Sequence, residues 1–353
     1  MKSPNHAVAS ALVAATLLTT LVACGPARWA EHGAGNNGAS GSPDTAVKPA
    51  VFESFLQDDA ANKVDILIVN DNSASMDEEQ TKMSTRFANF VSALKGIDYR
   101  IAMTTTDIDS KRWGQHGKIM PWGTGGKDLV LTPATLDAST KFKQTIQRTE
   151  TIGCIDVNDG YYCPSSTEQP LKAIELAIDE RTGANSALFR DNVDFVAVVL
   201  SDEDEKSTGP SGATKAEDVV AHFQKAFNGT KRMNVHGIVV KPGDSVCLKK
   251  QASQGKGAKS SYATRVSALA GLTNGSLNSI CDSDYSKSLS SISSQVQKLV
   301  SSFDLEQAPK AGTVKVKLVP APSEALNWSV EGNHLIFSTP PAAGTRIEVS
   351  YEI

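Results

Sequence analysis

The sequence predicts an α/β protein with a doubly wound, mostly parallel sheet, followed by a small antiparallel β-unit. Short apolar, mostly β-branched runs, such as those at 64–69 and 195–200, alternate with longer stretches of helical periodicity. Such runs are typical of strands buried on both faces of a parallel sheet, and their alternation with helices is typical of doubly wound folds. After Pro309 the apolar period becomes two, which indicates antiparallel strands with one solvent-exposed face.

The composition is that of an ordinary globular protein with a sizeable core. Hydrophobic residues make up 40% of the 353 residues and charged residues 21%, so the chain is long enough for one large domain and a smaller unit. The formal net charge is −4 and the sequence contains no basic stripe. Both observations argue against nucleic acid as a partner.

The first 23 residues predict a signal peptide, because Lys2 precedes an apolar run at 7–23 that is short for a membrane span. The run ends in Leu21-Val22-Ala23-Cys24, which resembles the lipobox of bacterial lipoproteins. The resemblance implies cleavage before Cys24, lipid attachment to its sulfur and anchoring of the protein in the membrane of the cell envelope. The residue directly after Cys24 is Gly25 and not an Asp, which is expected for a lipoprotein sorted to the outer membrane of a Gram-negative bacterium. An ordinary signal peptide with an incidental cysteine is the alternative.

The remaining chain divides into three predicted regions. Residues 24–50 are rich in Gly, Ala, Ser, Asn and Pro and show no apolar period, so we expect a flexible tether. We expect the main α/β domain at 51–308 and the antiparallel β-unit at 309–353. Because the β-unit is too small to be stable alone, it should pack against the main domain.

Each expected element follows from its apolar pattern, taken here in chain order. Apolar runs predict strands at 64–69, 99–106, 195–200 and 234–240, with an edge strand at 276–280. Apolar residues at three- and four-residue spacing predict helices directly after Met76 and at 135–148, 171–178, 215–227, 262–272 and 288–303. Two-residue alternation predicts strands at 314–318 and 347–353 and a hairpin at 328–337.

Four cysteines remain after Cys24, and in an exported protein they indicate two disulfides. Of the three possible pairings we favour Cys154–Cys163 with Cys247–Cys281, because each bond closes a short local loop. In the chain-entropy model these loops contribute roughly 3 and 4 kcal/mol. A zinc site is the alternative, but no Cys-x-x-Cys spacing occurs. The loop inside the first pair predicts a turn, although it resembles a calcium site one residue short: Asp156, Asn158 and Asp159.

Polar side chains follow two of the buried strands and precede one helix. Their loops should meet at the carboxyl edge of the sheet, where open α/β sheets bind ligands. Hard oxygen ligands with few charges suit Mg²⁺ or Mn²⁺. The expected ligands are Asp71, Ser73 and Ser75 after the first strand, Asp202 after the strand at 195–200, and one hydroxyl of Ser165 or Thr167. Ser75 also forms a capping box with Glu78, so Asp71 is the cleaner probe of the site.

These three loops, in this order, resemble the metal-ion-dependent adhesion site of von Willebrand factor A domains. The D-x-S-x-S pattern that begins at Asp71 matches the first loop of the family, and Asp202 matches the last loop. The middle loop departs from the Gly-x-Thr of the family, and Ser165 and Thr167 both remain candidates. The resemblance covers residues 62–303. It implies a Rossmann-like fold and a divalent ion that binds an acidic residue of a protein partner.

The predicted function is therefore metal-dependent binding of a protein, without catalysis. One alternative is a structural envelope lipoprotein with a degenerate site, and another is a metal-dependent hydrolase. The sequence contains neither a Gly-x-Ser-x-Gly elbow nor a P-loop, and Ser92-x-x-Lys95 lies within an amphipathic helix without its companion motifs.

Overall fold

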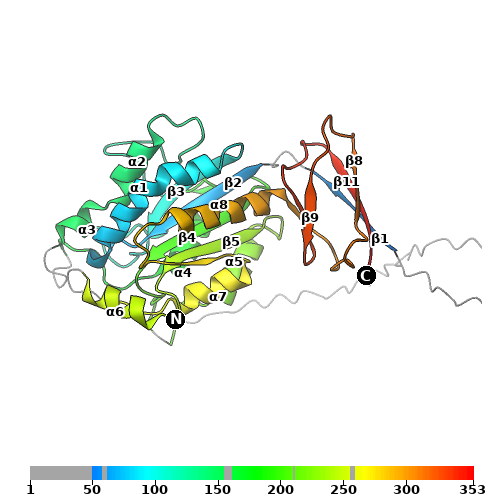
Figure 1. Cartoon of the computed structure of the whole chain (residues 1–353). Helices are drawn as coiled ribbons and strands as arrows, with labels where there is room; N and C mark the ends of the chain where they lie inside the picture. The colour runs from blue at the N-terminus through cyan, green and yellow to red at the C-terminus, as the bar shows by residue number, and fades with distance from the viewer. Residues whose placement is uncertain (1–49, 58–61, 155–160, 210, 255–258) are drawn as a thin grey trace, which may run out of the picture. The chain divides into compact units, whose positions relative to one another are not determined.

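A five-stranded parallel sheet forms the centre of the α/β domain in this computed structural model (Figure 1). The structure describes residues 50–57, 62–154, 161–209, 211–254 and 259–353. The strand order is β3-β2-β4-β5-β6, and all neighbours are parallel. The strands are β2 (Lys63–Asn70), β3 (Asp98–Thr105), β4 (Asp194–Ser201), β5 (Met233–Val239) and β6 (Leu277–Ser279). The prediction of an α/β fold with a parallel sheet is confirmed.

Helices cover both faces of this sheet, which makes the domain doubly wound (Figure 1). One face carries α1 (Asp77–Ala93), α2 (Ala138–Ile146) and α8 (Ser286–Ser301), whose apolar residues join one buried cluster. The opposite face carries α4 (Pro170–Asp179), α5 (Ala216–Ala226) and α7 (Thr264–Leu272), which belong to a second cluster. Each face of the sheet therefore has its own hydrophobic core.

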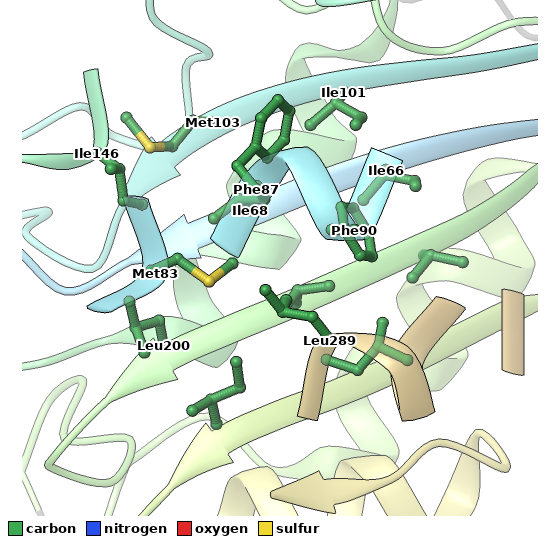
Figure 2. Packing of buried hydrophobic residues seen from close by; sticks show 14 of the residues in the cluster. Ile66, Ile68, Met83, Phe87, Phe90, Ile101, Met103, Ile146, Leu200 and Leu289 are labelled. Carbon is green, nitrogen blue, oxygen red and sulfur yellow. The ribbon is translucent and has the colours of Figure 1, made fainter. Parts of the chain in front are cut away.

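The helix α1 is fixed on the sheet by its apolar stripe (Figure 2). Met83, Phe87 and Phe90 are buried in one cluster with Ile66 and Ile68 of β2. Their three- and four-residue spacing puts all three side chains on one side of the helix. Full burial of one such side chain contributes roughly 1.5–3 kcal/mol. This packing sets where the short polar loop between β2 and α1 lies, and that loop carries Asp71.

Several short elements were not predicted from the sequence. They are the helices α3 (Thr149–Gly153) and α6 (Ser245–Ser253) and the 3₁₀ turns η1 (Ala74–Met76) and η2 (Glu180–Thr182). The structure contains both favoured disulfides, Cys154–Cys163 and Cys247–Cys281. The turn predicted between the first pair, with its resemblance to a calcium site, lies largely outside the described residues.

The antiparallel β-unit consists of two three-stranded sheets, β1-β11-β8 and β7-β10-β9. Its strands are β1 (Ala50–Leu56), β7 (Ser302–Asp304), β8 (Lys315–Val319), β9 (Trp328–Glu331), β10 (His334–Phe337) and β11 (Arg346–Glu352). The unit has its own buried core, which includes Leu335, Phe337, Ile347, Val349 and Tyr351. Two of its strands, β1 and β7, come from outside the predicted range 309–353, because β1 pairs with β11 and β7 pairs with β10.

The predicted signal peptide, Cys24 and nearly all of the tether lie outside the described residues, so they stay predictions. In the part of the chain that the structure describes, no helix combines the length and the apolar character needed to cross a membrane.

Candidate metal centre

The loops after β2 and β4 meet at the carboxyl edge of the sheet. Asn70, the last residue of β2, is paired with Thr105 of β3 on one side and Leu200 of β4 on the other. The backbone N–H of Asp71 then donates to the carbonyl of Leu200 at 2.9 Å. The chain continues from β2 to β3 on one side and later to β4 on the other, so β2 is the topological switch point. Ligands of open α/β sheets bind at this point.

The first loop is organised around the fully buried carboxylate of Asp71. Its Oδ1 accepts the backbone N–H of Ser73 at 2.8 Å, and its Oδ2 accepts the hydroxyl of Ser201 at 2.7 Å. The hydroxyls of Ser73 and Ser75 lie 3.0 Å apart and share a hydrogen bond. The structure thus brings the three D-x-S-x-S side chains together beside the end of β4.

Ser75 does not cap the helix, in contrast to the predicted capping box. The N-cap residues of η1 and α1 are Ser73 and Met76, and neither side chain makes a capping hydrogen bond. The hydroxyl of Ser75 is directed to Ser73 instead. Replacement of Ser75 is therefore a more direct test of the site than the sequence indicated.

The last loop contains four consecutive acids, and three of them have structural partners. The carboxylate of Glu203 accepts Nζ of Lys206 at 2.5 Å. Asp204 accepts the backbone N–H of Arg265 at 3.0 Å at the start of α7, and Glu205 accepts the backbone N–H of Leu171 at 2.7 Å at the start of α4. Carboxylates stabilise helix starts in this way because they satisfy free N–H groups there.

Asp202 is the exception in this run. It is fully buried, and neither carboxylate oxygen has a hydrogen-bond partner within the described residues. Burial and the charges of Asp71 and Glu203 raise the pKa of Asp202 well above its usual range, which the nearby hydroxyl of Ser75 opposes in part. A buried carboxylate without compensation is costly, and either a bound proton or an external cation relieves that cost.

The middle loop brings a residue that the sequence analysis missed, Glu168, next to Asp71. Its fully buried carboxylate accepts the hydroxyl of Thr106, while its Oε1 has no partner among the described residues. Burial and the charge of Asp71 raise the pKa of Glu168 well above its usual range. Burial also raises the pKa of Asp71, and the hydrogen bonds from Ser201 and Ser73 oppose this.

Of the two predicted middle-loop hydroxyls, that of Ser165 has a partner within its own loop. The hydroxyl of Ser165 accepts the backbone N–H of Thr167 at 3.0 Å. The backbone N–H of Ser165 donates to Asp107 at 3.0 Å. Asp107 thus fastens the loop. The sequence does carry one signal for Glu168: it directly precedes Gln169-Pro170, the pair at which α4 begins.

The residues at this edge fit a divalent cation in their chemistry. Across the described ranges, no Lys, Arg or His side chain forms an ion pair with Asp71, Glu168 or Asp202. The same part of the chain contains no group of three or more His, Cys, Asp or Glu side chains arranged to hold a metal ion. Three unpartnered carboxylate oxygens and the hydroxyls of Ser73 and Ser75 are nevertheless hard oxygen donors, which Mg²⁺ and Mn²⁺ prefer.

No protein-family model and no curated protein matches the chain. Among solved structures, the chain is similar to the pilus adhesin SpaC of Lactobacillus rhamnosus GG, with 11% identity over 86% of this chain and 40% of the adhesin and a TM-score of 0.32. It is also similar to an aerotolerance-related membrane protein from Bacteroides fragilis, with 14% identity over 66% of this chain and 98% of that protein and a TM-score of 0.33.

A third similar structure is proximal thread matrix protein 1 from the mussel byssus, with 13% identity over 73% of this chain and 51% of that protein and a TM-score of 0.36. The chain spans 40% of the length of the pilus adhesin. Because these scores are low, the similarities carry no functional conclusion, which must come from the site itself.

Proposed function

We propose that this protein binds a protein partner through a divalent cation, Mg²⁺ or Mn²⁺, at the carboxyl edge of its sheet. The single observation that supports the proposal most is Asp202, a fully buried carboxylate with two unpartnered oxygens beside Asp71 and Glu168. Removal of a carboxylate from water costs several kcal/mol unless an opposite charge compensates it. A cation at this edge supplies that charge.

The proposed ligands are the carboxylates of Asp71, Glu168 and Asp202 with the hydroxyls of Ser73 and Ser75. Glu168 takes the place that the sequence analysis gave to Ser165 or Thr167. A bound Mg²⁺ supplies a Lewis-acidic centre that keeps water in some coordination positions. Ser75 is partly exposed, so the edge is open to solvent on that side. An acidic residue of the partner would replace water there.

The proposal is one of binding and does not involve catalysis. Asp71 accepts two hydrogen bonds and Glu168 one, and these contacts fix the orientation of the two carboxylates. The partner is described here by its chemistry alone, as a protein that presents an accessible Asp or Glu side chain.

The location of the protein forms a second part of the proposal. We infer from the lipobox-like sequence before Cys24 that the protein is lipid-anchored in the cell envelope, in the outer membrane of a Gram-negative source. Metabolic labelling with a fatty acid tests this part. The wild type should incorporate label and the Cys24→Ser variant should not, whereas equal labelling of both would contradict the anchor.

A metal-dependent pull-down tests the binding function. The purified folded domain is immobilised and exposed to envelope or host-cell extract, with Mg²⁺ or with EDTA. The expected result is a bound protein that is lost with EDTA and with Asp71→Ala, and that is retained by Asp128→Ala. Asp128 is an exposed control acid, paired with Lys141 at 2.9 Å. Binding that persists both in EDTA and in the Asp71→Ala variant would contradict the proposal.

A further inference from the structure

The first loop of the proposed site is held by hydrogen bonds to the short helix α3. The hydroxyl of Thr151 donates to the backbone carbonyl of Asn72 at 2.7 Å, and the side-chain amide of Asn72 donates to Glu150 at 3.3 Å. Gln80 of α1 donates both to the carbonyl of Asp71 at 2.8 Å and to Thr151 at 3.2 Å. The backbone of the loop is therefore held at Asn72 by α3 and at Asp71 by Gln80 of α1, and α3 is far from this loop in sequence.

A disulfide connects the end of α3 to the middle loop. Cys154 directly follows α3, and its bond to Cys163 reaches the chain five residues before Glu168. Both cysteines are buried in one small cluster with Ala74. Ala74 stands between Ser73 and Ser75, so the disulfide packs directly against the loop that carries the two proposed hydroxyl ligands.

The middle loop is tied to its neighbours mainly by single hydrogen bonds. The backbone N–H of Lys206 donates to the carbonyl of Glu168 at 2.8 Å, and Gln169 donates to Thr106 at 3.2 Å. These bonds hold the loop near the last loop and near β3. The disulfide adds the covalent connection toward the first loop. Through it, α3, the D-x-S-x-S loop and the Glu168 loop form one linked unit.

We propose that the Cys154–Cys163 disulfide is a positioning element of the metal site, which holds the first and middle loops at the spacing that one cation requires. The inference rests on the proposed function. Mg²⁺ demands a near-ideal octahedral arrangement, so small displacements of its ligands weaken binding. Contacts behind the ligands are worth about 10–100-fold in metal affinity in other metal sites. The disulfide has this supporting position here.

The second disulfide provides a matched control. Cys247 lies in α6, and Cys281 lies two residues after the end of the edge strand β6. The sequence separation of this pair is 34 residues, against 9 for the first pair. In the chain-entropy model the longer loop stabilises the fold more. Loss of the control disulfide should therefore reduce stability at least as much as loss of Cys154–Cys163.

Titration calorimetry with MgCl₂ tests the inference on the folded protein. The double variants Cys154→Ser/Cys163→Ser and Cys247→Ser/Cys281→Ser are compared with the wild type well below their melting temperatures. We expect Mg²⁺ affinity to fall about tenfold or more in the first variant and to stay unchanged in the second. Both variants should melt at a lower temperature, so a purely structural role would move both affinities alike.

A second variant, Thr151→Val, keeps the disulfide and removes only the hydroxyl that holds Asn72. It is measured in case the first double variant does not fold, and it should bind Mg²⁺ more weakly than the wild type.

The outcomes separate the two proposals. If the wild type binds neither Mg²⁺ nor Mn²⁺, both the proposed function and this inference are wrong. If the wild type binds the ion and both Thr151→Val and Cys154→Ser/Cys163→Ser bind it equally well, the proposed function stands and the positioning role is refuted.

Discussion

The two edges of the parallel sheet treat buried acids in opposite ways. At the amino edge, the fully buried Asp65 receives Nε of Arg190 at 2.7 Å on one oxygen and the backbone N–H of Arg190 at 2.8 Å on the other. Asp194 at the same edge receives Nη2 of Arg232 at 2.6 Å. At the carboxyl edge, Asp202 is equally buried; among the described residues it forms no ion pair, and only the hydroxyl of Ser75 lies near its unpartnered oxygens.

The two acids differ in the charges that surround them. Burial raises the pKa of Asp65, and the hydrogen bonds and charge of Arg190 oppose this rise from within the chain. At the carboxyl edge the neighbours of Asp202 are Asp71 and Glu203, whose charges raise the pKa of Asp202 further. Within the described residues, no basic side chain pairs with Asp202, and this is the edge at which we propose that a metal ion binds.

The largest expected effect comes from removal of the built-in counter-ion. Arg190→Ala leaves the charge of Asp65 buried and unpaired, and we expect a loss of about 3–5 kcal/mol in the free energy of unfolding. Urea denaturation measures it. At the other edge, Asp202→Asn removes a charge that has no partner, so without divalent ions it should cost little or stabilise the fold. Equal losses in the two variants would remove the distinction between the edges.

The titration of His236, a residue in the middle of β5, provides a control for the pH dependence of stability, because this residue lies at neither edge of the sheet. His236 of β5 is buried, which lowers its pKa from 6.5 to about 4. Between these two values the unfolded chain binds a proton that the folded chain does not, so stability is lost as the pH falls from 6.5 to 4. The loss from this group should amount to about 3 kcal/mol.

His236→Asn tests this pH dependence, because the backbone N–H of Ser276 donates to Nδ1 of His236 at 3.0 Å and the Asn oxygen can accept the same bond. Urea unfolding at several pH values should show a shallower acid loss in the variant, in both Mg²⁺ and EDTA. An acid loss that His236→Asn leaves unaltered would contradict a buried, neutral His236.

The smallest expected effect separates the candidates in the middle loop. Glu168→Gln removes one proposed carboxylate ligand, and we expect Mg²⁺ affinity to fall about tenfold or more, which corresponds to roughly 1.4 kcal/mol. Thr167→Ala should leave the affinity unchanged, because the hydroxyl of Thr167 is not among the proposed ligands. Calorimetric titration of both variants decides between them, and the reverse pattern would restore the original choice of a hydroxyl.

The fold could be predicted from the sequence wherever one element alone carried the signal. The buried strands β2 and β4 are nearly continuous apolar runs, and α1 and α8 have clear apolar stripes, so their type did not depend on partners. The strand β1 was missed because its partner β11 lies almost at the other end of the chain. Short helices such as α3 were missed because their stability comes from tertiary contacts rather than from periodicity.

The site could be predicted only in part, for a related reason. Asp71 and Asp202 directly follow apolar strands, and strand order alone brings them to one edge. Glu168 follows no strand, and its burial next to Asp71 depends on how Asp107 and Lys206 hold the middle loop. The role of Asp204 was equally hidden, because it lies in a run of four acids and only the structure shows that it accepts a backbone N–H at the start of α7.

Calorimetric titration of Mg²⁺ into the wild type, Asp202→Asn and Asp204→Asn tests the central claim most directly. The two variants carry the same chemical change two residues apart, one in the unpartnered acid and one in the acid that caps α7. We predict that the wild type and Asp204→Asn bind the ion and that Asp202→Asn gives no measurable binding. Binding by Asp202→Asn as tight as that of the wild type, or no binding of Mg²⁺ and Mn²⁺ by the wild type, would contradict the account.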